Sequence, residues 1–242
     1  MIKKITFVII LILSFGIISC FMQNSFKLKI DSYEYVITDN NINNTFKAII
    51  DNNIYDMTPL IYASFSGNLP LAKFSIENGA DINTEVAGKT ALIIASEKGN
   101  FDMVKYLVEK GSDINAFNNW DGISALMMAS RFGYLEIVKY LVEKGADIDA
   151  KNNNGWTSLM YASVYGHLEV VKYLIENKAN INARNKYNAT ALMFDSGNGK
   201  FEVAEYLIKN KANINIRAES GRNALDFAKY YVDRLFGVNN EE

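Results

Sequence analysis

Residues 155–182 read Gly-Trp-Thr-Ser-Leu-Met-Tyr-Ala-Ser-Val-Tyr-Gly-His-Leu-Glu-Val-Val-Lys-Tyr-Leu-Ile-Glu-Asn-Lys-Ala-Asn-Ile-Asn. Thr157 is a residue type that caps a helix, and Leu159 lies on the inward side of the short helix that would follow. Gly166 favours a chain reversal, because glycine adopts a left-handed backbone at little cost. Apolar residues then recur at helical spacing over 168–176, with charged residues between them. The stretch therefore predicts two antiparallel helices and a projecting loop.

The same phrase recurs along the whole chain. Each copy opens with Thr, Ser or Asn, then a small residue or Pro, then Leu; the copies begin at Thr58, Thr90, Ser124, Thr157, Thr190 and Asn223. Their start points are separated by 32, 34, 33, 33 and 33 residues. A period this regular indicates a stack of identical units, each of which buries its apolar face on its neighbours. A stack of this kind is first of all a binding surface.

The repeated pattern resembles the ankyrin repeat over about residues 53–236. The resemblance implies an all-α solenoid of about five full repeats with degenerate end caps, in which helix pairs stack side by side and loops project at right angles. We assign the ankyrin-repeat domain to residues 45–242, with repeats starting near 53, 85, 119, 152 and 185 and a partial carboxy-terminal cap from 218. The segment from Phe46 to Ile50 resembles a degenerate half-repeat that covers the first full one.

Three departures from the family pattern carry information. The family's His after the motif Leu is replaced by an apolar residue, namely Ile61, Ile93, Met127, Met160 and Met193, which predicts plain apolar packing. The family's Gly after the second helix is replaced by Lys178 and then by Lys211. A lysine held in the left-handed conformation is strained, unless the neighbouring Asn177 or Asn210 takes the left-handed conformation in its place. Asp195 stands where the other copies have Ala. We therefore expect the carboxy-terminal repeats to be the softest part of the stack.

The amino terminus has the features of an export signal. Lys3 and Lys4 precede an uncharged apolar run over residues 5–18, which is short for a membrane span of about 20 residues. The run ends in Ile17-Ile18-Ser19-Cys20, which resembles the bacterial lipobox and implies cleavage before Cys20 and lipidation of Cys20. Residues 1–19 are then a lipoprotein signal peptide, and 20–44 a tether and the start of the cap, with a strand-like alternation over Lys27–Ile30. An uncleaved signal anchor and an ordinary cleaved signal remain alternatives.

Catalytic chemistry finds little support in the sequence. The 25 basic and 27 acidic residues nearly balance and form no long basic run, which argues against nucleic acid. The one His, His167, lies where the family commonly has His, and the one Cys is Cys20, so no nucleophile pair is predicted. Asp81, Asp113 and Asp147 recur at one repeat position, which indicates loop hydrogen bonding. We predict no enzyme, no cofactor and no metal site.

Asp195 is the one acid for which several roles stay open. A carboxylate at a helix-packing position is expected to be partly buried, and perturbed acids sometimes mark function. Structural degeneracy of the fifth repeat, a polar contact to a ligand and catalysis are the three interpretations, of which the first is favoured.

A recognition stripe is predicted from the family's variable positions, which lie in the projecting loop and at the end of the first helix and line one concave face. These positions hold Trp120, Ile123, Arg131, Phe132, Trp156, Val164, Tyr165 and Tyr187. Clustered exposed Trp, Tyr and Arg are typical of binding hot spots. The alternative is that the loop aromatics pack against one another and only stabilise the stack.

These patterns together predict an exported, lipid-anchored protein that binds a partner protein of unknown identity at a bacterial envelope membrane. A preformed rigid surface loses little ordering entropy on binding. Two other functions stay open: an inhibitor or protector of an envelope enzyme, and a structural envelope protein that binds a wall or membrane component.

Overall fold

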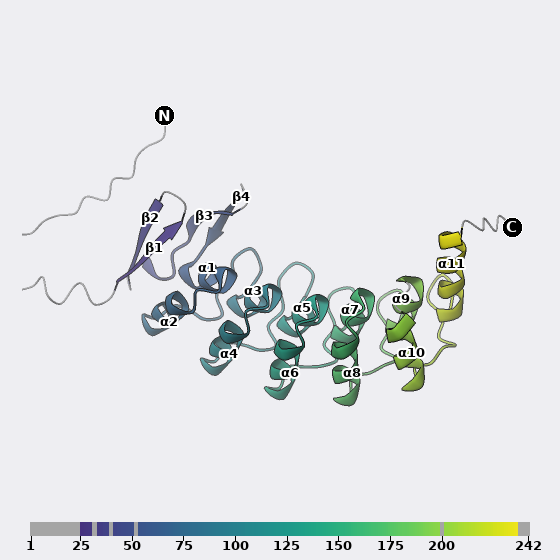
Figure 1. Cartoon of the computed structure of the whole chain (residues 1–242). Helices are drawn as coiled ribbons and strands as arrows, with labels where there is room; N and C mark the ends of the chain where they lie inside the picture. Colours follow the sequence, from purple (N-terminus) through teal and green to yellow (C-terminus); the bar gives the residue numbers. More distant parts are fainter. Residues whose placement is uncertain (1–24, 31–32, 39–40, 51–52, 199–200, 237–242) are drawn as a thin grey trace, which may run out of the picture.

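The computed structural model describes residues 25–30, 33–38, 41–50, 53–198 and 201–236. Within these residues, four strands are followed by eleven helices (Figure 1). The strands are β1 (Ser25–Ile30), β2 (Tyr33–Thr38), β3 (Phe46–Ile50) and β4 (Asn53–Met57). The helices are α1 (Pro59–Ser66), α2 (Leu69–Glu77), α3 (Ala91–Lys98), α4 (Phe101–Glu109), α5 (Ala125–Phe132), α6 (Leu135–Glu143), α7 (Ser158–Tyr165), α8 (Leu168–Glu176), α9 (Ala191–Asn198), α10 (Phe201–Lys209) and α11 (Ala224–Phe236).

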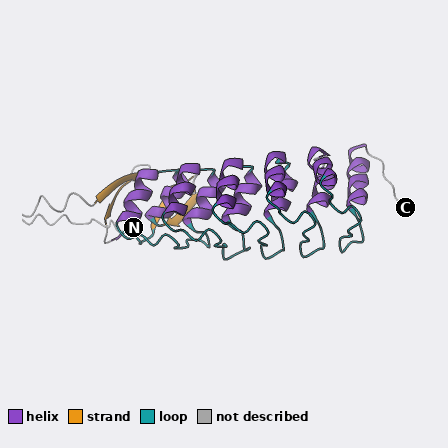
Figure 2. Ribbon diagram, turned by 90° about the horizontal axis from the view of Figure 1, so that it is seen from below, coloured by secondary structure: helices purple, strands orange, loops and turns teal. Residues whose placement is uncertain are grey.

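The helices form a row of pairs. The inner helices α1, α3, α5, α7, α9 and α11 pack on one another in sequence order, and the outer helices α2, α4, α6, α8 and α10 form a second row (Figure 1). The loops between repeats project from one side of the helix layer (Figure 2). The predicted all-α repeat solenoid is therefore confirmed.

Each repeat begins and ends where its sequence predicts. The first four inner helices start behind a Thr or Ser whose hydroxyl accepts a hydrogen bond from the backbone N–H three residues on, at 3.3–3.4 Å. Gly133 ends α5 with a φ of 75°. A Cβ there would lie 2.5 Å from Nδ1 of His167, so only glycine allows the next repeat to approach this closely.

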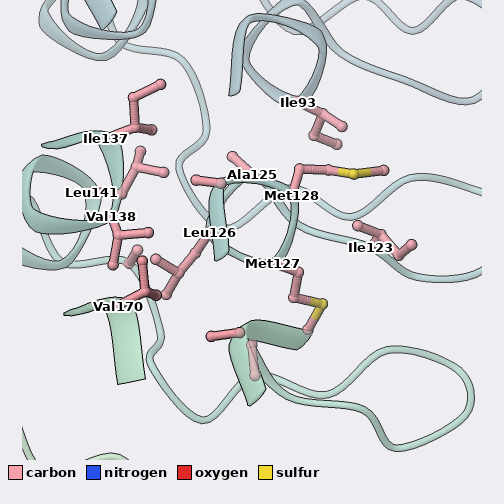
Figure 3. Close-up of a cluster of buried hydrophobic side chains, with 14 of the residues drawn as sticks. Ile93, Ile123, Ala125, Leu126, Met127, Met128, Ile137, Val138, Leu141 and Val170 are labelled. Carbon is pink, nitrogen blue, oxygen red and sulfur yellow. The ribbon is translucent and has the colours of Figure 1, made fainter. Parts of the chain in front are cut away.

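The core lies between the two helix rows and runs the length of the stack. Figure 3 shows Leu126 directed toward Val138 and Val170, whereas Met128 and Ile123 lie on the other side of α5. The residues that replace the family's His are all buried, and Met127 and Met160 are completely inaccessible to solvent. Plain apolar packing at this position is therefore confirmed, and it stabilises the contact between repeats by dispersion and by burial of apolar area.

The recurring Asp and Asn residues join each loop to the next. Oδ1 of Asp113 accepts a hydrogen bond from the backbone N–H of Asn115 at 2.9 Å, and Oδ1 of Asn115 accepts one from Asp147 of the following repeat, also at 2.9 Å. The same two bonds recur from Asp81 to Asn215. This polar ladder confirms that these carboxylates serve loop hydrogen bonding.

The amino-terminal end is covered by two antiparallel β-hairpins. β1 pairs with β2, with Ser25 opposite Thr38, and β3 pairs with β4, with Phe46 opposite Met57. The strand-like alternation over Lys27–Ile30, from which the sequence gives no assignment, lies within β1. The half-repeat expected from Phe46 takes the form of a hairpin. Between the hairpins, Asn43 donates to the Gly79 carbonyl at 3.2 Å and accepts from the Asp81 N–H at 3.0 Å. Asn43 therefore continues the polar ladder into the cap.

The carboxy-terminal repeats carry the strain that the sequence predicts. Lys178 and Lys211 adopt left-handed φ values of 73° and 69°, at the position where earlier repeats have Gly. Asn177 has a φ of −92°, so it does not take over the left-handed role. A non-glycine residue held in this region costs on the order of 1–2 kcal/mol, so we still expect the last repeats to be less stable than the first ones.

Candidate functional site

The predicted lipidation site, Cys20, lies outside the described residues. None of the helices in the described part of the chain combines the length and the apolar character that crossing a membrane demands. Within the same residues, no group of three or more His, Cys, Asp or Glu side chains is arranged to hold a metal ion.

His167 has a structural role. Its Nε2 lies 2.9 Å from the carbonyl oxygen of Arg131 in the preceding repeat, and its ring covers Gly133. Asn100, at the same repeat position as His167, makes a similar bond two repeats earlier, donating from Nδ2 to the Ser64 carbonyl at 3.0 Å. Both side chains therefore join neighbouring repeats at the helix turn, as the prediction of a structural histidine requires.

Asp195 is fully buried in α9, with 0% exposure. Within the described residues, neither of its carboxylate oxygens has a hydrogen-bond partner. Burial raises the pKa of Asp195 to about 8, and the nearby hydroxyl of Ser163 on α7 opposes the rise without reaching hydrogen-bond geometry. A side chain without exposed surface has no route to a ligand, which favours the structural interpretation of this residue.

Trp120 is the most exposed of the predicted contact residues, at 69%. It lies at the tip of the loop between α4 and α5. Its ring is close to Gly88 of the previous loop, since a Cβ added at Gly88 would lie 3.2 Å from the ring Nε1. Its ring lines two grooves of about 310 and 250 Å³ on the surface formed by the loops and inner helices, which we call the inner face. Trp120 therefore stands between two hollows and presents a large apolar side chain to solvent.

The first groove is mainly apolar, and the second is bordered by charge. The first is lined by Asp56, Met57, Ile61, Phe65, Val86, Ala87, Lys89, Ile94, Glu97, Lys98 and Trp120. The second is lined by Lys89, Glu97, Asn118, Trp120, Asp121, Ile123, Met128, Arg131 and Phe132. An ion pair between Lys89 and Glu97, with Nζ and Oε2 2.5 Å apart, belongs to both grooves.

Arg131 joins the predicted aromatic residues into one cluster at the end of α5. Its guanidinium carbon lies 5.7 Å from the centroid of the Phe132 ring and 5.6 Å from that of Tyr165 in the next repeat. Both rings are exposed, and Tyr165 also stacks on His167. The rings hold the guanidinium in place by cation–π attraction.

Three of the predicted contact residues contribute little free surface. Ile123 is only 3% exposed and forms part of the wall of the second groove. Trp156 is half-buried, because its ring stacks on Phe194 of the following repeat at a centroid distance of 4.5 Å and contacts Tyr161 at 5.2 Å. Val164 is also half-buried. Trp156 therefore packs against its neighbours, as the packing alternative expects, whereas Trp120 is left exposed to solvent.

Tyr187 is exposed but lines neither groove. It lies in the loop before α9, and Nζ of Lys186 is 4.9 Å from its ring centroid. The structure thus brings Trp120, Arg131, Phe132 and Tyr165 together on the inner face and leaves Tyr187 farther along the row of loops. The predicted stripe is densest over the third and fourth repeats.

The sequence reasoning missed Lys89, Glu97 and Lys98, which line the first groove. The repeat pattern contained a signal for them. Lys89 lies directly before Thr90, as Ile123 lies directly before Ser124. Glu97 and Lys98 occupy the same repeat positions as Arg131 and Phe132. Counting from the motif in the second repeat as well as the third would have included all three.

Comparisons with known families agree with this architecture. A family model described as ankyrin repeats (3 copies) matches residues 34–118 and 116–185, and one described as ankyrin repeats (many copies) matches residues 174–228. No curated protein matches the chain. The family matches extend over most of the sequence and coincide with the helix pairs described above. The chain therefore belongs to the ankyrin-repeat family.

Proposed function

We propose that this chain is an exported, lipid-anchored protein that binds a partner protein at the bacterial cell envelope. Ankyrin repeats generally mediate protein–protein interaction, and no catalytic family matches the chain. The envelope location and the anchor are supported by residues 17–20 and the apolar run that precedes them. Burial of several acyl chains, at about 0.8 kcal/mol per CH₂, would hold the protein on its membrane.

The observation that supports the binding surface is the exposure of Trp120 between two grooves of the inner face. A tryptophan that a loop scaffold holds in place loses little rotamer freedom when a partner covers it. Arg131 lies beside it with the aromatic rings around it, and the Lys89–Glu97 pair borders the grooves. The partner is therefore a protein surface that inserts an apolar side chain beside Trp120 and places an acid opposite Arg131.

The test is capture of the partner from detergent-solubilised envelopes after crosslinking from the full-length chain. Wild type should recover one stoichiometric protein, and Trp120→Ala should weaken its capture by about 30-fold or more, as for a hot-spot residue. The control is Lys105→Ala, which truncates an exposed side chain on the outer helix α4 that lines neither groove of the inner face. Equal recovery by wild type and Trp120→Ala would remove the inner face as the site.

The nature of the captured species separates the alternatives. An envelope enzyme whose activity changes on binding would make the chain its inhibitor or protector. Recovery of a wall or membrane component in place of a protein would make the chain structural. Cys20→Ser tests the anchor independently: incorporation of labelled fatty acid should be lost and the precursor should stay unprocessed. Equal label in wild type and variant would contradict the anchor.

A further inference from the structure

The carboxy-terminal end of the solenoid exposes an apolar position that every internal repeat buries. Leu225, in α11, is 60% exposed. The residues at the same repeat position, which are at most 3% exposed, are Leu60, Leu92, Leu126, Leu159 and Leu192. In the internal repeats the inner helix packs on an outer helix of its own repeat, as α9 packs on α10. Among the described residues α11 has no such outer helix, and it stands alone at the end of the row (Figure 1).

The last outer helix and the loop that follows it are exposed for the same reason. Ile208, in α10, is 53% exposed, whereas its counterparts Ile76, Val108, Val142 and Ile175 are half-buried against the core. Ile214 is 50% exposed, whereas its counterparts Ile82, Ile114 and Ile148 are half-buried. We refer to Ile208, Ile214 and Leu225 as the end face. These residues occupy the positions that a following repeat would cover.

The internal interfaces show what shape fits the end face. Each outer helix after the first contacts the inner helix of its own repeat and the preceding outer helix: α8 lies on α7 and α6, and α10 lies on α9 and α8. A helix in the next position would lie on α11 and α10 and cover Leu225 and Ile208. We propose that the end face is a docking site for an amphipathic helix of a partner protein, which occupies the place of a sixth outer helix.

The charges on α10 define the chemistry of the docked helix. Within the stack, a lysine of one outer helix faces a tyrosine of the next: Nζ of Lys73 lies 5.9 Å from the Tyr106 ring centroid, and Nζ of Lys139 lies 5.8 Å from that of Tyr173. In α10 the lysine position holds Glu205, which is exposed. A carboxylate at this place favours a cation in the docked helix where the internal repeats have tyrosine.

Glu202 lies one turn before Glu205 on the same helix and is also exposed. The partner segment is therefore a helix with an aliphatic stripe and a Lys or Arg at its centre. This mode of recognition lays an apolar helix face into a preformed groove, and its anchors recur at helical spacing. It is independent of the inner face, because Trp120 and the end face belong to different repeats.

A peptide built from this chain's own outer helix tests the docking site. The probe is residues 166–182 with Tyr173→Arg, labelled at its amino terminus, with Lys172 and Glu176 joined as a lactam to hold the helix. Fluorescence anisotropy with the full chain should show saturable binding in a one-to-one ratio. The same peptide with Tyr173 retained should bind about two- to fivefold more weakly, the range for an exposed charge pair.

Two variants and one control locate the binding. Ile208→Lys should weaken binding of the peptide by about tenfold or more, because the variant places a charge in the apolar contact. Glu205→Lys should weaken binding of the peptide that carries Arg at position 173 and should strengthen binding of a peptide that carries Glu there. Trp120→Ala should bind the probe as wild type does, which separates this site from the inner face. Circular dichroism melting checks that the variants fold, and Leu225→Lys replaces Ile208→Lys if that variant does not.

Three results would overturn the proposal. The first is the absence of saturable peptide binding to the wild-type chain. The second is binding that Ile208→Lys and Leu225→Lys leave unchanged. The third is a dimer of the full chain, found by light scattering and abolished by Ile208→Lys, because a second copy would then be the occupant. Loss of partner capture in Trp120→Ala alone, with unchanged peptide binding, supports two separate surfaces.

Discussion

Replacing Asp195 by Ala should stabilise the fifth repeat near neutral pH. Asp195 is completely buried without a hydrogen-bond partner among the described residues. The corresponding residues of the first four repeats, which are also fully buried, are Ala63, Ala95, Ala129 and Ala162. Burial of an unpaired polar group is costly, and alanine fits this position in the same fold.

The magnitude follows from the pKa of the carboxyl group. An aspartate carboxyl in the unfolded chain has a pKa of 3.8, and burial raises the pKa of Asp195 to about 8 in the folded chain. The folded state is therefore favoured most below pH 3.8, and it loses stability as the pH rises toward 8, because only the unfolded chain releases the proton easily. At about 1.36 kcal/mol per pH unit, the loss by pH 7 is about 4 kcal/mol.

The assay compares wild type and Asp195→Ala in guanidinium unfolding at several pH values between 4.5 and 8. The difference in the free energy of unfolding should grow by about 1.36 kcal/mol per pH unit in favour of the variant. Hydrogen exchange over residues 191–198 and 201–210 locates the effect, since repeats open unequally. Ala162→Asp is the matched control, because it should introduce a similar pH dependence into the fourth repeat. A difference that stays constant with pH would refute the reasoning.

Four further substitutions probe the stack. Lys211→Gly should stabilise by up to about 1 kcal/mol, because the φ of 69° is strained for lysine; a fall in thermal stability would contradict this. Leu159→Ala should destabilise by about 2–5 kcal/mol, because its site between two neighbours cannot collapse fully; denaturant unfolding measures it, and a loss below about 1 kcal/mol would be unexpected. In both of these variants the backbone amides of residues 201–236 should exchange their hydrogens faster than those of residues 91–150. Trp156→Ala should lower the melting temperature, whereas Trp120→Ala should leave it unchanged, because only Trp156 stacks on Phe194; equal melting of the two variants would argue against this difference.

The repeat architecture could be predicted from the sequence because it depends on local rules that recur. A helix cap such as Thr157 acts on the backbone three residues away, and Gly166 acts on its own φ angle. The left-handed conformation of Lys178 and Lys211 could be predicted in the same way, since the position of a residue within the repeat fixes its backbone conformation. The polar ladder is another case, because each Asp and Asn repeats the same two hydrogen bonds.

The amino-terminal cap could not be assigned fully. Residues 46–52 precede the first full copy, so no second example indicated their fold, and the structure pairs β3 from this segment with β4 in a hairpin. Only contacts with the first repeat, such as the bonds of Asn43 to Gly79 and Asp81, show how this segment covers the stack.

By itself, the sequence determined the solenoid, its period, the N-caps of its inner helices and its strained carboxy-terminal positions, because these depend on residues close together along the chain. Tertiary structure alone decided which predicted contact residues are available to a partner. Trp120 and Trp156 both lie in projecting loops, but the ring of Trp156 is covered by Phe194, a side chain 38 residues later. Leu225 carries the same motif as five buried leucines and is exposed because no outer helix covers it among the described residues. Burial depends on what the neighbouring repeat supplies, and a single copy of the motif does not contain that information.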